Sequence, residues 1–427
     1  MIARSTTLSP ERSVAVAAFA AIVLFVGTWT LLHFGFYTHN HISDVGVYQR
    51  YGNAIADGKV PYRDFRLEYP PGALPVFAVP GLIAPGKGER LTRGFRRTFE
   101  TVMWVCGAAA ILAMAIIVGA LRRRPANVWA ALVFAALAPL ALGSVILSRY
   151  DLWPTALLVG ALAALVTARF RAGHALLGVG AAAKIFPAVL APLAFAYVWK
   201  RSGRREALVC VGVLAGVIAA IFLPFVALSP GGVWHSFSVQ LGRPLQVESL
   251  GSSLLLAAHH VFGLGVTGET SHGSQNLAGD GADAVAFVSL VAQAAALIWI
   301  WTSFARGRGG REALVRTAVA SVCAFVAFGK VLSPQFMIWL IPLVPLVRGR
   351  RNLSASGLLA AALVLTHIWF PTRYFRLSLE FEEGLSWVLL ARNLVLVALV
   401  VVLVLPLRDR NSNGLATRRA AVGSALD

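Results

Sequence analysis

An acidic residue follows directly after the first long apolar run of the chain. Asp44 opens the segment SDVGVYQRYGNAIADGKVPYRDFRLEYPPG (residues 43–72), and Tyr48, Tyr51 and Ile55 follow at helical spacing. The pattern predicts a short amphipathic helix. A carboxylate at its start can act as a general base toward a hydroxyl group. It can also simply complement the positive end of the helix, and the residues alone leave both roles open.

Cationic side chains occur on several other polar segments. The candidates for binding a phosphate are Arg149, Arg243, His259 and Lys330. Cations of this kind can stabilise the negative charge that develops on a departing phosphate. With an acid nearby, they suit transfer from a lipid phosphate to a hydroxyl group. These cations also have simpler explanations that involve no substrate. The charges over 242–260 could be ordinary surface charges of an interfacial helix, and the Lys330 side chain could extend to the membrane surface.

Further polar residues on the same segments could bind a sugar or an acceptor. They are Tyr48, Glu68, Tyr69, Asp151, Gln246, Glu248 and Gln335. A second acid could be Glu68, Asp151 or Glu248, so use of a divalent metal stays open and no metal ligands are assigned. The three cysteines lie in apolar runs without a C-x-x-C pair, which argues against a disulfide framework or a structural zinc.

Several common catalytic motifs are missing from the sequence. It contains no G-x-x-x-x-G-K-[ST], no H-E-x-x-H, no G-x-S-x-G and no D-x-D pair. The first three absences argue against a P-loop nucleotide site, a zinc peptidase and a serine hydrolase. The last argues against a metal site for a nucleotide sugar.

The composition shows what kind of protein must position these residues. Of 427 residues, 58% are hydrophobic and 13% are charged, whereas soluble domains carry roughly a quarter charged residues. The mean hydropathy is +0.72. We therefore expect an all-α polytopic membrane protein. The run from Val14 to Tyr37 is long enough to span a bilayer and too long for a cleaved signal peptide.

The net charge of +19 comes from short basic clusters between the apolar runs. This distribution indicates membrane topology rather than nucleic-acid binding, and it predicts that the clusters face the cytoplasm. About 10–12 transmembrane helices are expected, with both termini inside. The run 175–199 contains Lys184 and Pro187 and is basic at both ends, so we predict a broken pair of short helices there, interrupted at Pro187.

These predicted transmembrane helices imply one transmembrane domain over residues 1–406. It has a first outer loop over 38–98, a second over 229–283, and amphipathic helices on the outer face. Residues 407–427 form a polar cytoplasmic tail that is expected to be disordered.

Four segments carry a resemblance to a known family. They are residues 43–72, AAAKIFPAVLAPL, GRPLQVESLG and GKVLSPQFMIWLIPL. The chain resembles the GT-C superfamily of membrane glycosyltransferases, and most closely the actinobacterial glycosyltransferase family 87 type. The resemblance implies a GT-C-like helix bundle, a polyprenyl-phosphate sugar donor and inversion at the anomeric carbon. It also implies that Asp44, in the first outer loop, is the catalytic base.

The preferred hypothesis is a mannosyltransferase of the plasma membrane. Its site would face outside, and its acceptor would be a glycolipid or glycan of the cell envelope. Two alternatives remain: an arabinosyltransferase that uses polyprenyl-phosphoarabinose, and a lipid-linked-sugar flippase without transferase activity, for which the broken helix would also suit a substrate path.

Overall fold

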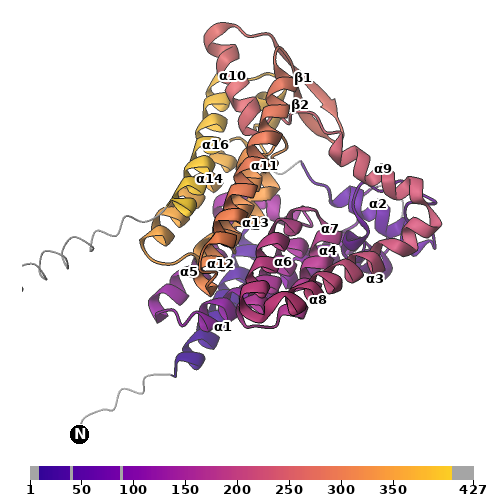
Figure 1. Cartoon of the computed structure of the whole chain (residues 1–427). Helices are drawn as coiled ribbons and strands as arrows, with labels where there is room; N and C mark the ends of the chain where they lie inside the picture. Colours follow the sequence, from indigo (N-terminus) through magenta and orange to yellow (C-terminus); the bar gives the residue numbers. More distant parts are fainter. Residues whose placement is uncertain (1–8, 39–41, 87–89, 406–427) are drawn as a thin grey trace, which may run out of the picture.

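The structure is a computed structural model, which describes residues 9–38, 42–86 and 90–405. These residues form sixteen α-helices, several short 3-10 helices and one two-stranded sheet (Figure 1). The prediction of an all-α polytopic membrane protein is confirmed. The predicted tail over 407–427 lies outside the described residues.

Seven helices are long and apolar enough to cross a membrane. They are α1 (Pro10–Leu31), α4 (Arg93–Ala120), α5 (Pro125–Leu142), α8 (Ala191–Leu228), α11 (Ala282–Arg306), α14 (Arg350–Trp369) and α16 (Glu383–Val404). Three further apolar stretches of the expected spans are also helical: α6 (Leu152–Val166), α7 (Phe170–Ala183) and α12 (Arg311–Phe328). The expected span over 335–347 is instead broken into η5 (Pro334–Phe336), α13 (Met337–Leu340) and η6 (Val344–Leu346).

The predicted break inside 175–199 is present, but it lies earlier than predicted. Helix α7 ends at Ala183, and Lys184 has an extended backbone (φ −161°, ψ 143°). Pro187 then occupies the start of η4 (Phe186–Leu190), where its missing N–H costs no hydrogen bond. The backbone breaks again inside α8, at Gly203 (φ 83°), and both arms of α8 pack against α7.

One end of the bundle collects the basic turns of the chain, and we call it the basic end. Arg123 bonds to Glu312 at 2.6 Å and to the carbonyl of Leu346. Lys200 bonds to the carbonyl of Phe304. These contacts join turns that are far apart in the sequence. The opposite end, which we call the loop end, carries the connection from α1 to α4.

Short elements cover the loop end. They are η1 (Gly35–Thr38), α2 (Val45–Ala56), η2 (Pro71–Ala73), α3 (Pro75–Ile83), η3 (Ser144–Leu147), α9 (Pro230–Leu241), α10 (Leu250–Phe262) and α15 (Tyr374–Ser378). Helix α2 stops before Asp57 and Gly58, and Gly58 has a φ of 79°. The apolar helix α3, inside the predicted first outer loop, was not expected.

The second outer loop contains a β-hairpin that the helical interpretation missed. Strand β1 (Val266–Ser271) pairs antiparallel with β2 (Ser274–Gly279) across a two-residue turn. Both turn residues, His272 and Gly273, have positive φ, as tight hairpin turns require. In space, the hairpin extends from beside α10 toward α9 (Figure 1).

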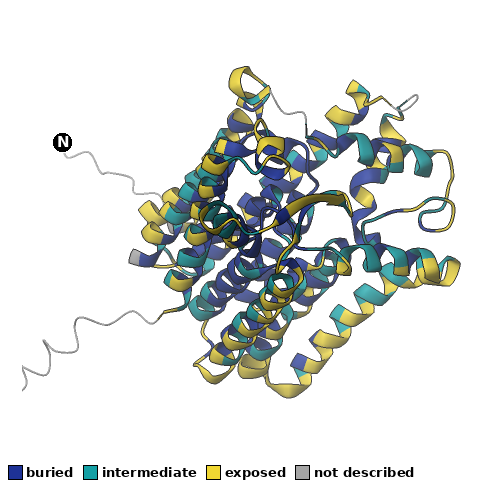
Figure 2. Cartoon of the chain, turned by 90° about the horizontal axis from the view of Figure 1, so that it is seen from above, coloured by how far each residue is buried: buried dark blue, intermediate teal, exposed yellow. Residues whose placement is uncertain are grey.

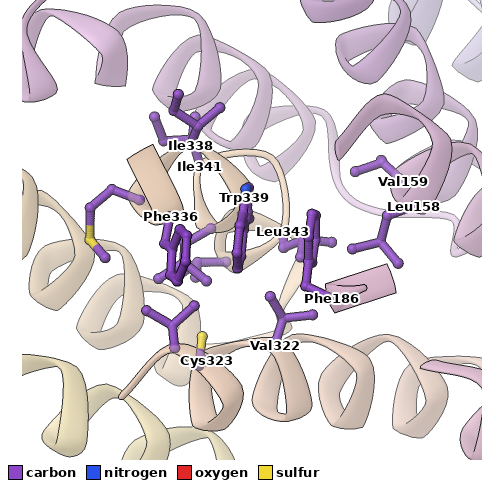
Figure 3. Packing of buried hydrophobic residues seen from close by; sticks show 14 of the residues in the cluster. Leu158, Val159, Phe186, Val322, Cys323, Phe336, Ile338, Trp339, Ile341 and Leu343 are labelled. Carbon is purple, nitrogen blue, oxygen red and sulfur yellow. The ribbon is translucent and has the colours of Figure 1, made fainter. Parts of the chain in front are cut away.

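Buried residues lie between the helices, and the outward faces of the bundle are exposed (Figure 2). Near the break after α7, Trp339 is stacked between two rings, with centroids 3.8 Å from Phe186 and 4.0 Å from Phe336 (Figure 3). This stack fixes α13 against the broken helix pair, and it therefore also fixes the backbone around Lys184.

Candidate functional site

The candidate base, Asp44, lies directly before α2, at the N-cap position of that helix. Within the described residues, the Asp44 carboxylate does not cap α2. It forms an ion pair with Arg149 and accepts a bond of 3.4 Å from the Tyr48 hydroxyl. Its side chain stays 31% exposed. The carboxylate thus faces a cation from another segment and remains accessible.

Arg149 and Asp151 belong to the tight connection between η3 and α6. The Arg149 side chain is 8% exposed, and its Nε has no partner among the described residues. Burial lowers the pKa of Arg149 to about 10, so its charge is retained at neutral pH. A buried guanidinium with a free N–H beside an exposed carboxylate can donate to an incoming phosphate.

Asp151 holds the lysine that follows α7. Its Oδ1 accepts bonds from Lys184 Nζ at 2.7 Å and from Trp339 Nε1 at 2.6 Å. The Lys184 ammonium also lies over three rings, 4.9 Å from Tyr150, 5.6 Å from Phe336 and 5.3 Å from Trp339. Asp151 is 1% exposed. It therefore positions and neutralises Lys184, and this geometry does not suit it as a proton acceptor for a substrate.

Arg243 approaches the same place from the second outer loop. It lies close enough to Lys184 and Glu248 to influence their charges. Its Nη2 donates to the His272 carbonyl in the hairpin turn at 3.1 Å, and its Nε is buried without a partner in the described parts of the chain. We call Asp44, Arg149, Asp151, Lys184 and Arg243 the loop-end cluster. It combines one accessible carboxylate with three cations from separate segments.

Aromatic side chains form the wall beside Asp44. The Tyr48 ring is buried against Tyr69 (5.8 Å between centroids), Phe77 (4.8 Å) and Tyr150 (5.9 Å). Tyr62, which precedes Tyr69 in the loop, bonds to the Tyr69 carbonyl at 2.6 Å. The wall holds α2 and the loop after it in place, and with them the direction of the Asp44 carboxylate.

Gln246 and Lys330, two of the other predicted site residues, form hydrogen bonds that involve the loop after α9. The Gln246 side chain donates to Ser333 at 2.9 Å, and its backbone N–H bonds to the Lys330 carbonyl. Lys330 Nζ contacts the Leu241 carbonyl at 3.4 Å. Gln335 is half-buried on η5. These residues join the end of α12 to the loop after α9, and they support the site without touching Asp44.

Glu248 is a buried acid behind Arg149. It is 1% exposed, and one carboxylate oxygen has no hydrogen-bond partner within the described ranges. Burial raises the pKa of Glu248 to about 7, and the nearby charges of Arg392 and Arg243 oppose this rise. The backbone carbonyl of Glu248 accepts from Arg392 at 2.8 Å. Glu248 is therefore a buried carboxyl with a raised pKa, close to the charges of Arg243 and Arg392.

Two predicted residues lie apart from the loop-end cluster. His259 is in the last turn of α10, where its Nδ1 donates to the Leu264 carbonyl at 2.7 Å. Glu68 lies beside the hairpin turn at Gly273, and its backbone carbonyl accepts from Gln240 at 3.4 Å. His259 bonds to the turn after α10, whereas Glu68 lies where the loop after α2 meets the hairpin.

The described residues contain no group of three or more His, Cys, Asp or Glu side chains that could hold a metal ion. A cavity of 460 Å³ lies between α1 and α4, lined by His33, Glu100 and Trp104 among others, and it includes none of the predicted site residues.

The family comparison follows from this site and this bundle. A model of glycosyltransferase family 87 matches residues 67–334, more than half of the chain. The chain belongs to glycosyltransferase family 87. A second model, mannosyltransferase (PIG-M), matches residues 271–406. No match to this family 87 glycosyltransferase is found among curated proteins. The predicted resemblance is confirmed, and the protein is a membrane glycosyltransferase.

The family 87 match contains most of the loop-end cluster but begins after Asp44. It includes Lys184, which the sequence places within an apolar run but which is not among the predicted site residues. Its signal was the rarity of lysine, since the chain has five, together with the K-I-F-P motif. Trp339 gave no comparable signal, because aromatic residues are common throughout this glycosyltransferase.

Proposed function

We propose that the protein transfers a mannosyl group from a polyprenyl-phosphate donor to a hydroxyl group of a glycolipid or glycan of the cell envelope. Asp44 serves as the general base. The observation that carries the proposal is the accessible Asp44 carboxylate beside Arg149, with Lys184 and Arg243 close by. It unites a proton acceptor and a phosphate-binding set at one end of a membrane bundle.

The proposed reaction is a single displacement with inversion. The acceptor hydroxyl gives its proton to Asp44 while its oxygen forms a bond to the anomeric carbon. The bond between that carbon and the phosphate oxygen breaks, and the electron pair leaves with the lipid phosphate. Arg149, Lys184 and Arg243 neutralise the charge on this leaving group. Because the donor phosphate competes for Arg149, donor binding weakens the Arg149–Asp44 pair and makes Asp44 a stronger base.

Mannose is preferred over arabinose because the second family model that matches the chain bears the name of a mannosyltransferase. The basic turns at the other end support an orientation with the loop end outside, and the plasma membrane is the location that we propose. Both statements belong to the proposal.

The test measures transfer from labelled polyprenyl-phosphomannose in reconstituted vesicles. Asp44→Asn keeps the shape of the side chain and removes its basicity, so activity falls by about 100-fold or more. Asp64→Asn is the matched control, since Asp64 lies in the same loop and pairs with its neighbour Arg63. Full activity of Asp44→Asn refutes Asp44 as base. Sugar that crosses the bilayer without a new glycosidic bond supports a flippase instead.

A further inference from the structure

A groove opens between three helices at the basic end, far along the chain from the loop-end cluster. Its volume is 220 Å³. One wall comes from α11 with Trp299, Ser303 and Phe304, and the other from the end of α16 with Leu403 and Val404. Ala313, Thr317 and Ala320, one turn apart on α12, form the floor. Small floor residues between apolar walls leave room for a narrow apolar chain.

The mouth of this groove is basic. Arg308 and Arg316 both line it, and none of the described lining residues is acidic. The nearest acid in the turn, Glu312, is already paired with Arg123 at 2.6 Å. Trp299 is 53% exposed on the outward face, as is common for tryptophan near a membrane interface. The groove therefore has apolar walls and a basic opening that attracts anions.

Helix capping explains some of these cations. Lys200 bonds to the carbonyls of Phe304 and Gly307 at the end of α11. Arg316 and Arg351 bond to the carbonyls of Leu403 and Leu405 at the end of α16. Lys200, Arg316 and Arg351 are thus engaged with carbonyls at the two helix ends.

Arg308 has no such role. It forms no hydrogen bond or ion pair with any residue that the structure describes, and it is exposed at the mouth. Helix α12 begins shortly after Arg308, and within the described residues its N-cap residue, Gly310, forms no side-chain capping bond. Arg308 is therefore a cation without a protein partner, placed next to a slot between membrane helices.

We propose that this groove binds an anionic phospholipid, with the phosphate between Arg308 and Arg316 and the start of one acyl chain along Ala313, Thr317 and Ala320. Charge complementarity selects this occupant, since a zwitterionic headgroup brings a cation into a site already surrounded by arginines. The apolar floor selects a lipid over a free anion. This inference is independent of the proposed sugar transfer, because the groove lies at the opposite end of the bundle from Asp44.

The test measures lipid binding to the intact protein by native mass spectrometry, with phosphatidylglycerol and phosphatidylcholine of the same chain length. Wild type retains phosphatidylglycerol preferentially. Arg308→Glu weakens that binding by about tenfold, since it reverses one headgroup charge. Arg306→Glu is the matched control, two residues away, with the same change of charge outside the groove. Ala313→Leu narrows the floor without changing charge, and it also reduces binding.

Three results overturn the proposal. The first is equal retention of the two lipids by wild type. The second is the same loss of phosphatidylglycerol in Arg308→Glu and Arg306→Glu, which reduces the effect to overall charge. The third is displacement of the lipid by inorganic phosphate, which identifies a site for a free anion. Arg308→Ala provides the same comparison if the charge reversal prevents folding.

Discussion

The buried guanidinium of Arg149 forms an ion pair with the accessible carboxylate of Asp44. The two residues are more than a hundred positions apart in the sequence. Asp44 lies directly before α2, and Arg149 lies in the connection between η3 and α6. If Arg149 receives the donor phosphate and Asp44 receives the acceptor proton, their contact marks the place where donor and acceptor meet.

Arg149→Gln removes the cation and leaves a side chain that can still donate a hydrogen bond. Transfer is expected to fall by roughly 100-fold to 1,000-fold, because the charge on the leaving phosphate loses a buried donor. The measurement is kcat/KM with labelled lipid-linked mannose. Arg66→Gln, on an exposed position of the first outer loop, is the control. Unchanged kcat with a raised KM contradicts a transition-state role and indicates uniform binding only.

Lys184→Met leaves the Asp151 carboxylate buried without its cation. The free energy of unfolding is expected to fall by about 3–5 kcal/mol, as for other broken buried pairs. The double variant Lys184→Met with Asp151→Asn should recover part of this loss, because the unpaired charge is then gone. Unfolding in detergent measures both, with Lys330→Met as the control. A double variant less stable than the Lys184 variant contradicts the pairing.

Tyr48→Phe keeps the buried ring and removes the hydroxyl that donates to Asp44 at 3.4 Å. A loss of one such bond predicts transfer reduced by about 3-fold to 10-fold, with little change in stability. Tyr48→Ala also opens a cavity among Tyr69, Phe77 and Tyr150. It should destabilise the protein by about 3–5 kcal/mol. Thermal unfolding and transfer assays on both variants separate the two roles. Equal stability of the two variants would show that the ring does not pack as described.

Glu248 makes stability depend on pH in a defined direction. Its pKa rises from 4.5 in the unfolded chain to about 7 in the folded protein. Between these values the native state binds more protons than the unfolded state, so stability falls as pH rises from about 4.5 to about 7. Glu248→Gln removes this contribution and should flatten the fall. Melting temperatures of both proteins across this window provide the test. Parallel curves would mean that the carboxyl ionises normally.

Composition and charge pattern together determined the fold class. The long apolar runs between basic clusters predicted a polytopic helical bundle, because a continuous apolar run of about 20 residues suits a spanning helix, whereas the strands of a membrane β-barrel are shorter and alternate apolar with polar residues. The helical spacing after Asp44 and the stop at Gly58 predicted α2 within a residue or two. The break near Lys184 was also predicted, although its position was displaced from Pro187 to the end of α7.

The tertiary structure alone decided which residues meet. Local patterns specify helices and turns, but the partner of a side chain depends on how distant segments pack. Thus Asp151 could be read as a second site acid until Lys184 and Trp339 were found to occupy it. Likewise, only the structure shows that His259 Nδ1 bonds to the Leu264 carbonyl, apart from the loop-end cluster. The β-hairpin gave no clear signal, since its strands are short, polar and held partly by Gln246 in the neighbouring loop. The sequence by itself determined a membrane bundle and its family, while long-range packing decided the pairing of Asp44 with Arg149.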